Sequence, residues 1–221
     1  MRILIKFPTR GRRKKFFETL DLYYKLSENV HNLKFLITID EDDLEMNNPE
    51  TIEDLKKYQN VEIDLGMSKS KVDAINKNIK VDDSWDILLL ASDDMVPQIK
   101  GYDTIISKMM EELYPDTDGV LFFNDGFKGN ELNTLCILGK KYYKRFNYIY
   151  NPEYKSTWCD NEFMEVANIL KKQTYLPITI IKHEHPDWGF GKNDDIHSKN
   201  YQNLNWDKDT YTKRKNMKFN L

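Results

Sequence analysis

The stretch Trp85–Pro97, WDILLLASDDMVP, is the part of the sequence that decides the fold class. Its apolar run, residues 87–90, has the character of a strand buried on both faces, as in a parallel sheet covered by helices. Two adjacent carboxylates, Asp93 and Asp94, follow where this strand leaves the sheet. Open α/β sheets bind ligands beyond the carboxyl ends of their strands, so we interpret this pair as part of a binding site. A solvated turn is the alternative, and we assign that simpler role to Asp82 and Asp83.

Strand and helix patterns alternate on both sides of this stretch. The pattern predicts a single α/β domain over residues 1–221, with a mostly parallel central sheet flanked by helices. Beyond residue 125 the alternation breaks down. From about residue 183 the polar and aromatic pattern predicts an irregular segment, which either covers the binding site or lies on the surface. The predicted strands are 3–7, 35–39, 61–65, 87–90, 120–123, 135–138 and 178–181, and the predicted helices lie around 16–24, 49–57, 72–79, 105–113 and 163–170.

The composition excludes several classes of protein. The 33 basic and 36 acidic residues nearly balance, so the chain has no basic excess of the kind that nucleic-acid binding requires. The apolar N-terminal run is short and Lys6 interrupts it, which argues against a signal peptide, and no transmembrane segment is expected. Two cysteines, Cys136 and Cys159, form neither a disulfide framework nor a metal knuckle. We therefore predict a soluble, cytoplasmic protein.

Polar side chains follow several of the predicted strands. Thr9 and Arg10 end the first strand and Asp40 ends the second, so these residues are expected to meet Asp93 and Asp94 at one rim. Paired carboxylates suit a hard divalent cation, and such a cation often neutralises the phosphates of a substrate. Neither GxGxxG nor a P-loop sequence occurs, which weighs against dinucleotide oxidoreductases and P-loop enzymes. A metal and Lys or Arg side chains must then balance any phosphate charge.

Two residues in and just before the predicted helix at residues 72–79 are further candidates. Asn76 faces the apolar stripe of this helix, so its amide needs buried partners. Those partners are either backbone groups of the sheet or a nucleotide in a pocket that the helix borders. Lys71, just upstream, is a candidate for contact with phosphate or base.

Taken in order, these elements resemble a known group. SDDM at Ser92–Met95, after ILLLA, resembles the metal-binding acidic motif of GT-A-fold glycosyltransferases, most nearly the inverting family-two type. The chain departs from the pattern at Ala91, where many relatives carry the first acid of an Asp-x-Asp triplet. The other elements that agree with the resemblance are PTR at residues 8–10, Asp40, the Lys71–Asn76 spacing, Asp160 in WCDNEF and HEHP at residues 183–186.

The resemblance implies a metal-dependent glycosyltransferase that moves a sugar from a nucleoside-diphosphate donor to a hydroxyl of a glycan or glycosylated acceptor, with inversion. It implies Mn²⁺ or Mg²⁺ at Asp93 or Asp94, with His185 or His183 as a further ligand. The nucleotide-binding half would span about residues 1–100, the acceptor half about 101–190 and a C-terminal tail about 191–221.

The resemblance also implies a general base. Asp160 is the carboxylate expected to deprotonate the acceptor hydroxyl, with Glu162 as the fallback. Thr157 and Asp160 also match a helix capping box, which would give Asp160 a structural role instead. Two other functions remain open: a nucleotidyltransferase of related fold, and a sugar- or nucleotide-binding module without catalysis.

Overall fold

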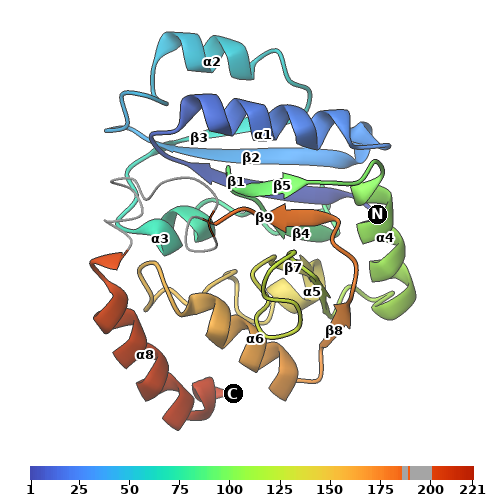
Figure 1. Ribbon diagram of the computed structural model, residues 1–221, viewed down its shortest axis with the longest axis vertical. Helices are drawn as coiled ribbons and strands as arrows, with labels where there is room; N and C mark the ends of the chain where they lie inside the picture. Colours follow the sequence, from blue (N-terminus) through green and yellow to red (C-terminus); the bar gives the residue numbers. More distant parts are fainter. Residues whose placement is uncertain (186–188, 190–200) are drawn as a thin grey trace.

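The computed structural model describes residues 1–185, 189 and 201–221 (Figure 1). Within these residues, seven strands form the central sheet in the order β3-β2-β1-β4-β7-β6-β8. Four neighbouring strands, β3 to β4 in this order, are parallel, while β7 runs antiparallel to both of its neighbours. The bounds are β1 Ile3–Thr9, β2 Leu33–Asp40, β3 Val61–Gly66, β4 Ile87–Leu90, β6 Val120–Phe123, β7 Ile137–Gly139 and β8 Gln173–Leu176.

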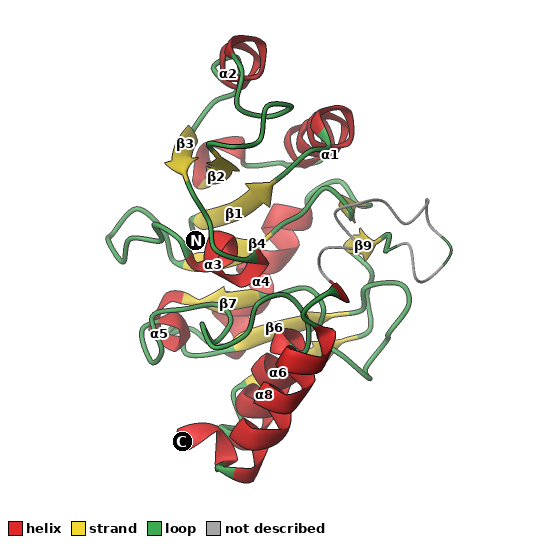
Figure 2. Ribbon diagram, turned by 90° about the vertical axis from the view of Figure 1, so that its left-hand side faces the viewer, coloured by secondary structure: helices red, strands yellow, loops and turns green. Residues whose placement is uncertain are grey.

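Helices pack on both faces of this sheet, as Figure 2 shows from the side. One hydrophobic cluster joins the sheet to α1 (Arg13–Lys25), α2 (Pro49–Leu55) and α4 (Tyr102–Leu113). A second cluster joins the other face to α3 (Lys71–Asn76), α5 (Lys140–Tyr143) and α6 (Cys159–Ile169). The C-terminal helix α8 (Leu204–Asn216) packs on α6, and short 3₁₀ turns occur at Val30–Asn32 and Lys218–Asn220. The mixed α/β architecture confirms the predicted fold class.

The central strand β1 shows how the sequence builds the two layers. Phe7 points toward α1, where its ring meets Phe16 edge-on at 4.9 Å between centroids. Lys6 points to the other face and is fully buried, and its ammonium donates to the Thr38 hydroxyl and to the Lys77 carbonyl (2.6 Å). Burial lowers the pKa of Lys6 to about 8. Pro8 is tolerated in this strand because the pairing of β1 with β4 ends at Lys6.

The structure corrects the predictions for the C-terminal part. No strand forms at 178–180; instead β8 ends at Leu176, and β9 (Ile181–His183) pairs antiparallel with β5 (Met95–Pro97) in a separate sheet of two strands. Residues 204–216 form a helix where an irregular tail was expected. Its buried positions are polar, namely Asp207, Thr210 and Arg214, so apolar periodicity could not reveal it. The rest of the predicted tail, residues 186–188 and 190–200, lies outside the described residues.

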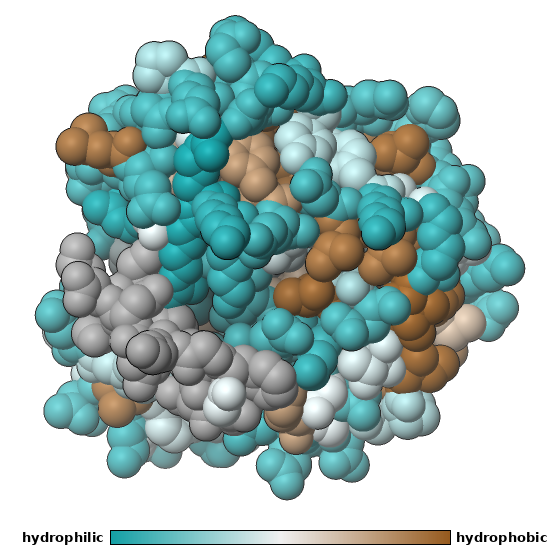
Figure 3. Space-filling view, turned by 45° about the horizontal axis from the view of Figure 1, so that its top comes forward, coloured by the Kyte–Doolittle hydropathy of each residue, from teal (hydrophilic) through white to brown (hydrophobic). Residues whose placement is uncertain are grey.

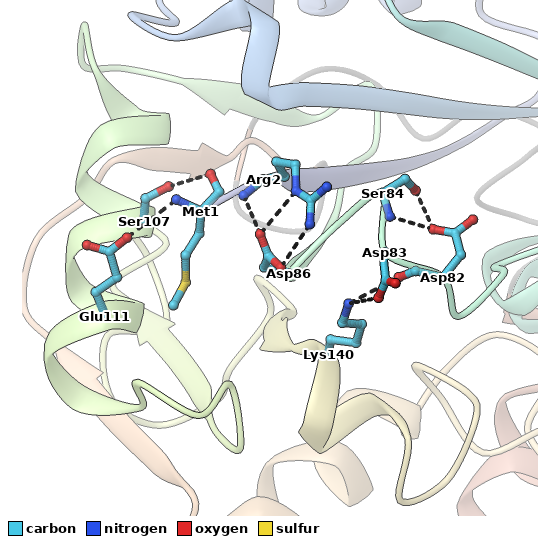
Figure 4. A network of polar contacts seen from close by, with 9 residues as sticks. All are labelled: Met1, Arg2, Asp82, Asp83, Ser84, Asp86, Ser107, Glu111 and Lys140. Carbon is cyan, nitrogen blue, oxygen red and sulfur yellow. Dashed lines mark hydrogen bonds and ion pairs between the residues drawn. The ribbon is translucent and has the colours of Figure 1, made fainter.

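The amino ends of β1 and β4 carry a polar network that is separate from the opposite rim (Figure 4). The Asp86 carboxylate accepts from the Arg2 backbone N–H at 2.9 Å. Asp82 accepts from the Ser84 backbone N–H at 2.8 Å, and exposed Asp83 lies 3.6 Å from the Lys140 ammonium. Asp82 and Asp83 thus form a solvated turn, which is the role that the sequence predicts for them.

Hydrophilic side chains cover most of the face seen in Figure 3, and hydrophobic ones gather in smaller patches. Every helix in the described part of the chain is too short or too polar to cross a lipid bilayer.

Candidate active site

A cavity of about 540 Å³ opens beyond the carboxyl ends of β1, β2 and β4. This volume is in the range of small-molecule binding sites. The cavity brings together nearly all the residues that the sequence singles out. Those that line it are Thr9, Arg10, Asp40, Lys71, Asp93, Asp94, Asp160, His183 and His185.

The turn after β4 points its two carboxylates in different directions. The Asp93 carboxylate faces Arg12, whose guanidinium nitrogen lies 3.2 and 3.3 Å from the two oxygens. The Asp94 carboxylate accepts from the Ser92 hydroxyl and faces His183. The Thr19 hydroxyl fixes the turn by donating to the Asp93 carbonyl at 2.8 Å. Asp94 is only 7% exposed; its Oδ1 accepts from Ser92, and its Oδ2 faces the His183 imidazole.

The charges around the turn shift both pKa values. Burial and the neighbouring Asp94 raise the pKa of Asp93, against the opposing effect of Arg12. Burial alone would raise the pKa of Asp94, but His183, the Ser92 hydroxyl and Lys71 outweigh it and hold that pKa below its ordinary value. Asp94 is therefore ionised at neutral pH.

The two-stranded sheet explains why His183 reaches this turn. Met95, the residue after Asp94, is paired with His183 in the β5–β9 register. The Glu184 backbone N–H donates to the Asp94 carbonyl at 2.7 Å, which ties the strand end to the turn. As a result the His183 Nε2 lies 3.6 Å from the Asp94 Oδ2, and the His185 ring lies 5.6 Å from the His183 ring. Both histidines line the cavity.

The donor atoms of this corner fit a divalent cation. Asp94 offers a carboxylate oxygen, a ligand that suits Mn²⁺ or Mg²⁺, and His183 offers an imidazole nitrogen, the side-chain group that most commonly binds metals. Among the described residues, no three His, Cys, Asp or Glu side chains converge as a complete metal site. Cations that act on nucleotides commonly use one or two protein ligands together with phosphate oxygens and waters. The pair therefore fits a metal that is held jointly by protein and substrate.

Asp160 lies in the first turn of α6 and also lines the cavity. The capping box, the alternative role for Thr157 and Asp160, does not form: the N-cap is Trp158, and the Thr157 hydroxyl donates to Asp207 at 3.2 Å. Burial raises the pKa of Asp160, against the opposing effects of the Asn161 backbone N–H (3.0 Å) and Lys71. The Asp160 carboxylate is thus left facing the cavity.

Glu162, the fallback base, has a different environment. It is buried, and both its oxygens accept from the Arg214 guanidinium at 2.7 and 2.9 Å. The Tyr154 hydroxyl also donates to it at 2.7 Å. Because Glu162 does not line the large cavity, its role is to join α6 to α8.

Arg10 and Asp40 bond to each other at the rim. The Arg10 guanidinium donates to Asp40 at 2.7 Å and to both oxygens of Asp42 at 2.7 Å each. The other Asp40 oxygen, Oδ1, is buried and makes no hydrogen bond to any described group. Such an acceptor is costly unless a ligand donor satisfies it.

Asn76, like Glu162, is a candidate that the structure does not bring into the cavity. Its Nδ2 donates to the Tyr150 carbonyl at 2.7 Å, and its Oδ1 accepts from the backbone N–H groups of Ile149 (2.9 Å) and Tyr150 (3.2 Å). These bonds use the amide to hold the segment at residues 149–150 against α3. The partners are backbone groups, as one interpretation expected, but they belong to a loop and not to the sheet. Contact with a nucleotide, the other interpretation, has no support in this geometry.

Several cavity-lining residues were not singled out as site candidates from the sequence, among them Arg12, Ser92 and Lys155. Arg12 belongs to the basic cluster at residues 10–15, and Ser92 stands inside the SDDM motif, so both had a visible signal. Lys155 lies in a loop without a motif, and only the tertiary fold places it at the cavity.

No protein-family model matches the chain, and no curated protein matches it in sequence. Solved structures do match. S. aureus TarS in complex with UDP-GlcNAc is 14% identical with a TM-score of 0.65, over 90% of this chain and 61% of that one. Mannosyltransferase PcManGT from Pyrobaculum calidifontis, in complex with GDP-Man and Mn²⁺, is 12% identical with a TM-score of 0.65, over 96% of this chain and 73% of that one.

A further match is the 4-diphosphocytidyl-2C-methyl-D-erythritol synthase from Anaerococcus prevotii, 16% identical with a TM-score of 0.50 over 82% of this chain and 89% of that one. The chain spans about 60% of the length of the first TarS structure. At these identities the likeness shows the fold. The chain has the GT-A fold, as the resemblance of its motifs predicts.

Proposed function

We propose that the protein is a metal-dependent glycosyltransferase that moves a sugar from a nucleoside-diphosphate donor to a hydroxyl of a glycan or glycosylated acceptor, with inversion. One observation carries the proposal: a single cavity joins the Asp94–His183 pair to the Asp160 carboxylate at the carboxyl end of the sheet. A metal-binding corner and a free base in one pocket are what this reaction needs.

The rim residues are suited to the nucleotide. The unsatisfied Asp40 Oδ1 is an acceptor for an N–H or hydroxyl of the nucleoside, and Arg10 holds this carboxylate in place at 2.7 Å. Thr9 adds polar groups at the end of β1, and Lys71 adds a positive charge for the phosphates. Asp93 contributes indirectly, because its bond to Arg12 orients the turn that carries Asp94.

Asp94 and His183 would hold the cation, Mn²⁺ or Mg²⁺, with His185 as a further nitrogen donor in the same cavity. When bound, the cation supplies positive charge that stabilises the departing diphosphate. Lys71 stabilises the same charge from α3. The low pKa of Asp94 keeps its carboxylate ionised for this purpose.

Asp160 would accept the proton of the attacking hydroxyl. Its raised pKa makes it a better base than an exposed aspartate at neutral pH. Attack on the face opposite the diphosphate inverts the anomeric centre, so this assignment supports an inverting reaction.

The proposed roles of these residues assign different functions to different parts of the chain. We assign donor binding mainly to residues 1–100 and acceptor binding to residues 101–190, since Asp160 lies in the second part. We also propose a cytoplasmic location, which the free and buried thiols of Cys136 and Cys159 support.

The test is incubation with a panel of nucleotide sugars and glycan acceptors, with Mn²⁺, Mg²⁺ or EDTA. The proposal expects metal-dependent release of nucleoside diphosphate and a glycosylated product. Asp94→Asn should weaken donor and metal binding, while Asp83→Asn, an exposed acid at the opposite end of β4, should behave as wild type. Absence of donor binding and turnover across the panel would contradict the proposal.

A nucleotidyltransferase is the second candidate, favoured by the match to the Anaerococcus prevotii synthase, of which this chain covers 89%. In such an enzyme an oxygen of the acceptor substrate attacks the α-phosphate of a nucleoside triphosphate, so that pyrophosphate is released. Pyrophosphate from nucleoside triphosphates, without nucleoside diphosphate from nucleotide sugars, would favour it. Tight donor binding with no product would instead indicate a binding module.

A further inference from the structure

Helix α8 inserts a carboxylate beneath the loop that leads into α6. Asp207 is fully buried and accepts four hydrogen bonds from this loop. Its Oδ1 accepts from the Lys155 backbone N–H at 2.8 Å, and its Oδ2 from the backbone N–H groups of Ser156 (2.9 Å) and Thr157 (2.8 Å) and from the Thr157 hydroxyl (3.2 Å). Charge-assisted bonds of this kind are strong, so Asp207 holds the loop in one conformation.

The loop at residues 155–157 connects two parts of the proposed site. On one side, the Lys155 carbonyl accepts from the Val72 backbone N–H at 3.1 Å, beside Lys71. On the other side, the chain passes through Trp158, which has φ 61°, and reaches Asp160 in the first turn of α6. A positive φ is unfavourable for a bulky residue and persists only where the surroundings enforce it. The bonds of Asp207 to the preceding three residues supply one such constraint, and the packing of the Trp158 ring against Tyr211 of α8, at 5.1 Å between centroids, supplies another.

We propose that Asp207 is a positioning residue that fixes the 155–157 loop and thereby aims the Asp160 carboxylate at the acceptor hydroxyl. The proposal rests on the proposed function, because it assigns to Asp160 the role of base. Asp207 does not line the cavity, so it acts through the loop and not by contact with substrate.

Two features separate this role from general stability. Helix α8 has a second anchor, because the Arg214 guanidinium bonds Glu162 at 2.7 and 2.9 Å and Glu153 at 2.6 Å. Helix α3 has its own N-terminal cap, since the Ser70 hydroxyl accepts from the Asp73 backbone N–H at 3.1 Å. Weakening the hydrogen bonds of Asp207 should therefore leave α8 packed on α6 and Lys71 in place, and change mainly the position of the Asp160 carboxylate.

The test compares Asp207→Asn with Asp209→Asn, an exposed acid two residues along the same helix. For Asp207→Asn we expect kcat for transfer to fall about 10- to 100-fold, the loss typical of a misplaced catalytic group, while KM for the donor changes less than about threefold. Amide hydrogen exchange at residues 155–157 should become faster. The Asp209→Asn variant should match wild type in all three measurements.

Thr157→Val removes only the hydrogen bond from the Thr157 hydroxyl to Asp207, so it should lower kcat by a smaller factor. Because this change is milder, the variant should fold even if Asp207→Asn does not. A wild-type kcat in the folded variants, or a parallel loss of kcat and donor binding, would overturn the positioning role. A wild-type protein that transfers no sugar at all would overturn the proposed function, and this role with it, before any substitution is made.

Discussion

Replacement of the proposed base, Asp160→Asn, should have opposite effects on activity and stability. Asparagine has nearly the same shape but cannot accept the proton, so kcat should fall by about 10²- to 10⁴-fold. That factor corresponds to about 2.7–5.5 kcal/mol of transition-state stabilisation. Donor binding should change little, because the hydrogen bonds found for the Asp160 carboxylate come from the backbone N–H groups of Asn161 and of Asp160 itself, and asparagine can accept both.

The stability effect follows from the raised pKa of Asp160. A carboxyl with a higher pKa in the folded than in the unfolded state destabilises the folded state where it is ionised, and this penalty disappears at pH values below both pKa values. The Asp160→Asn variant should therefore melt at a higher Tm than wild type at pH 7, on the order of a few °C. The difference should shrink as the pH falls through the raised pKa.

The assay combines initial rates at saturating donor and acceptor with thermal unfolding at neutral and acidic pH, and Asp83→Asn serves as the control. A folded Asp160→Asn variant with wild-type kcat would refute the assignment of the base. A lower Tm at pH 7 would refute the burial argument on which its raised pKa depends.

Four further outcomes are expected. Because Asp160 must be ionised, the rate should fall on acidification through a pKa above the ordinary aspartate value of about 4; a midpoint at or below that value contradicts the argument. Asp94→Asn should raise the Mn²⁺ concentration for half-maximal activity by at least about tenfold, and an unchanged metal titration would exclude Asp94 as a ligand. The pKa of Lys6 is lowered to about 8, so the folded state binds fewer protons than the unfolded chain between that pH and the ordinary lysine value. As the pH rises through this range, the free energy of unfolding measured by urea titration should therefore increase by on the order of 3 kcal/mol because of Lys6. The Lys6→Met variant should lack this increase, and parallel plots of unfolding free energy against pH for the two proteins would contradict the argument. Gly139→Ala would place a Cβ 2.1 Å from the Thr117 carbonyl oxygen, so it should destabilise the fold by about 1–3 kcal/mol, and an unchanged Tm would contradict the packing.

The sequence predicts the N-terminal part of the fold well because the signals there are local. Apolar runs define β1, β2 and β4, and the polar residues that end them, such as Thr9, Asp40 and Asp94, meet at one rim for a topological reason. Position after a buried strand also separates Asp94 from the exposed acidic pair near residue 82. Both features can be recognised without knowing any long-range contact.

The features that the sequence does not predict all depend on contacts between distant segments. The pairing of β5 with β9 brings His183 to Asp94, but each strand has only three residues and no clear pattern. Helix α8 buries Asp207 and Arg214, so it lacks the apolar stripe by which helices are recognised. Likewise, nothing local to Asn76 indicates that the backbone near residue 150 takes up its amide.

A crystal structure with UDP or GDP and Mn²⁺, with data collected at the manganese absorption edge, tests the central claim most directly. The account predicts one strong anomalous peak within about 2.5 Å of an Asp94 carboxylate oxygen, shared with the diphosphate of the nucleotide and close to His183. A nucleotide bound away from this cavity, or manganese bound without Asp94, would contradict it.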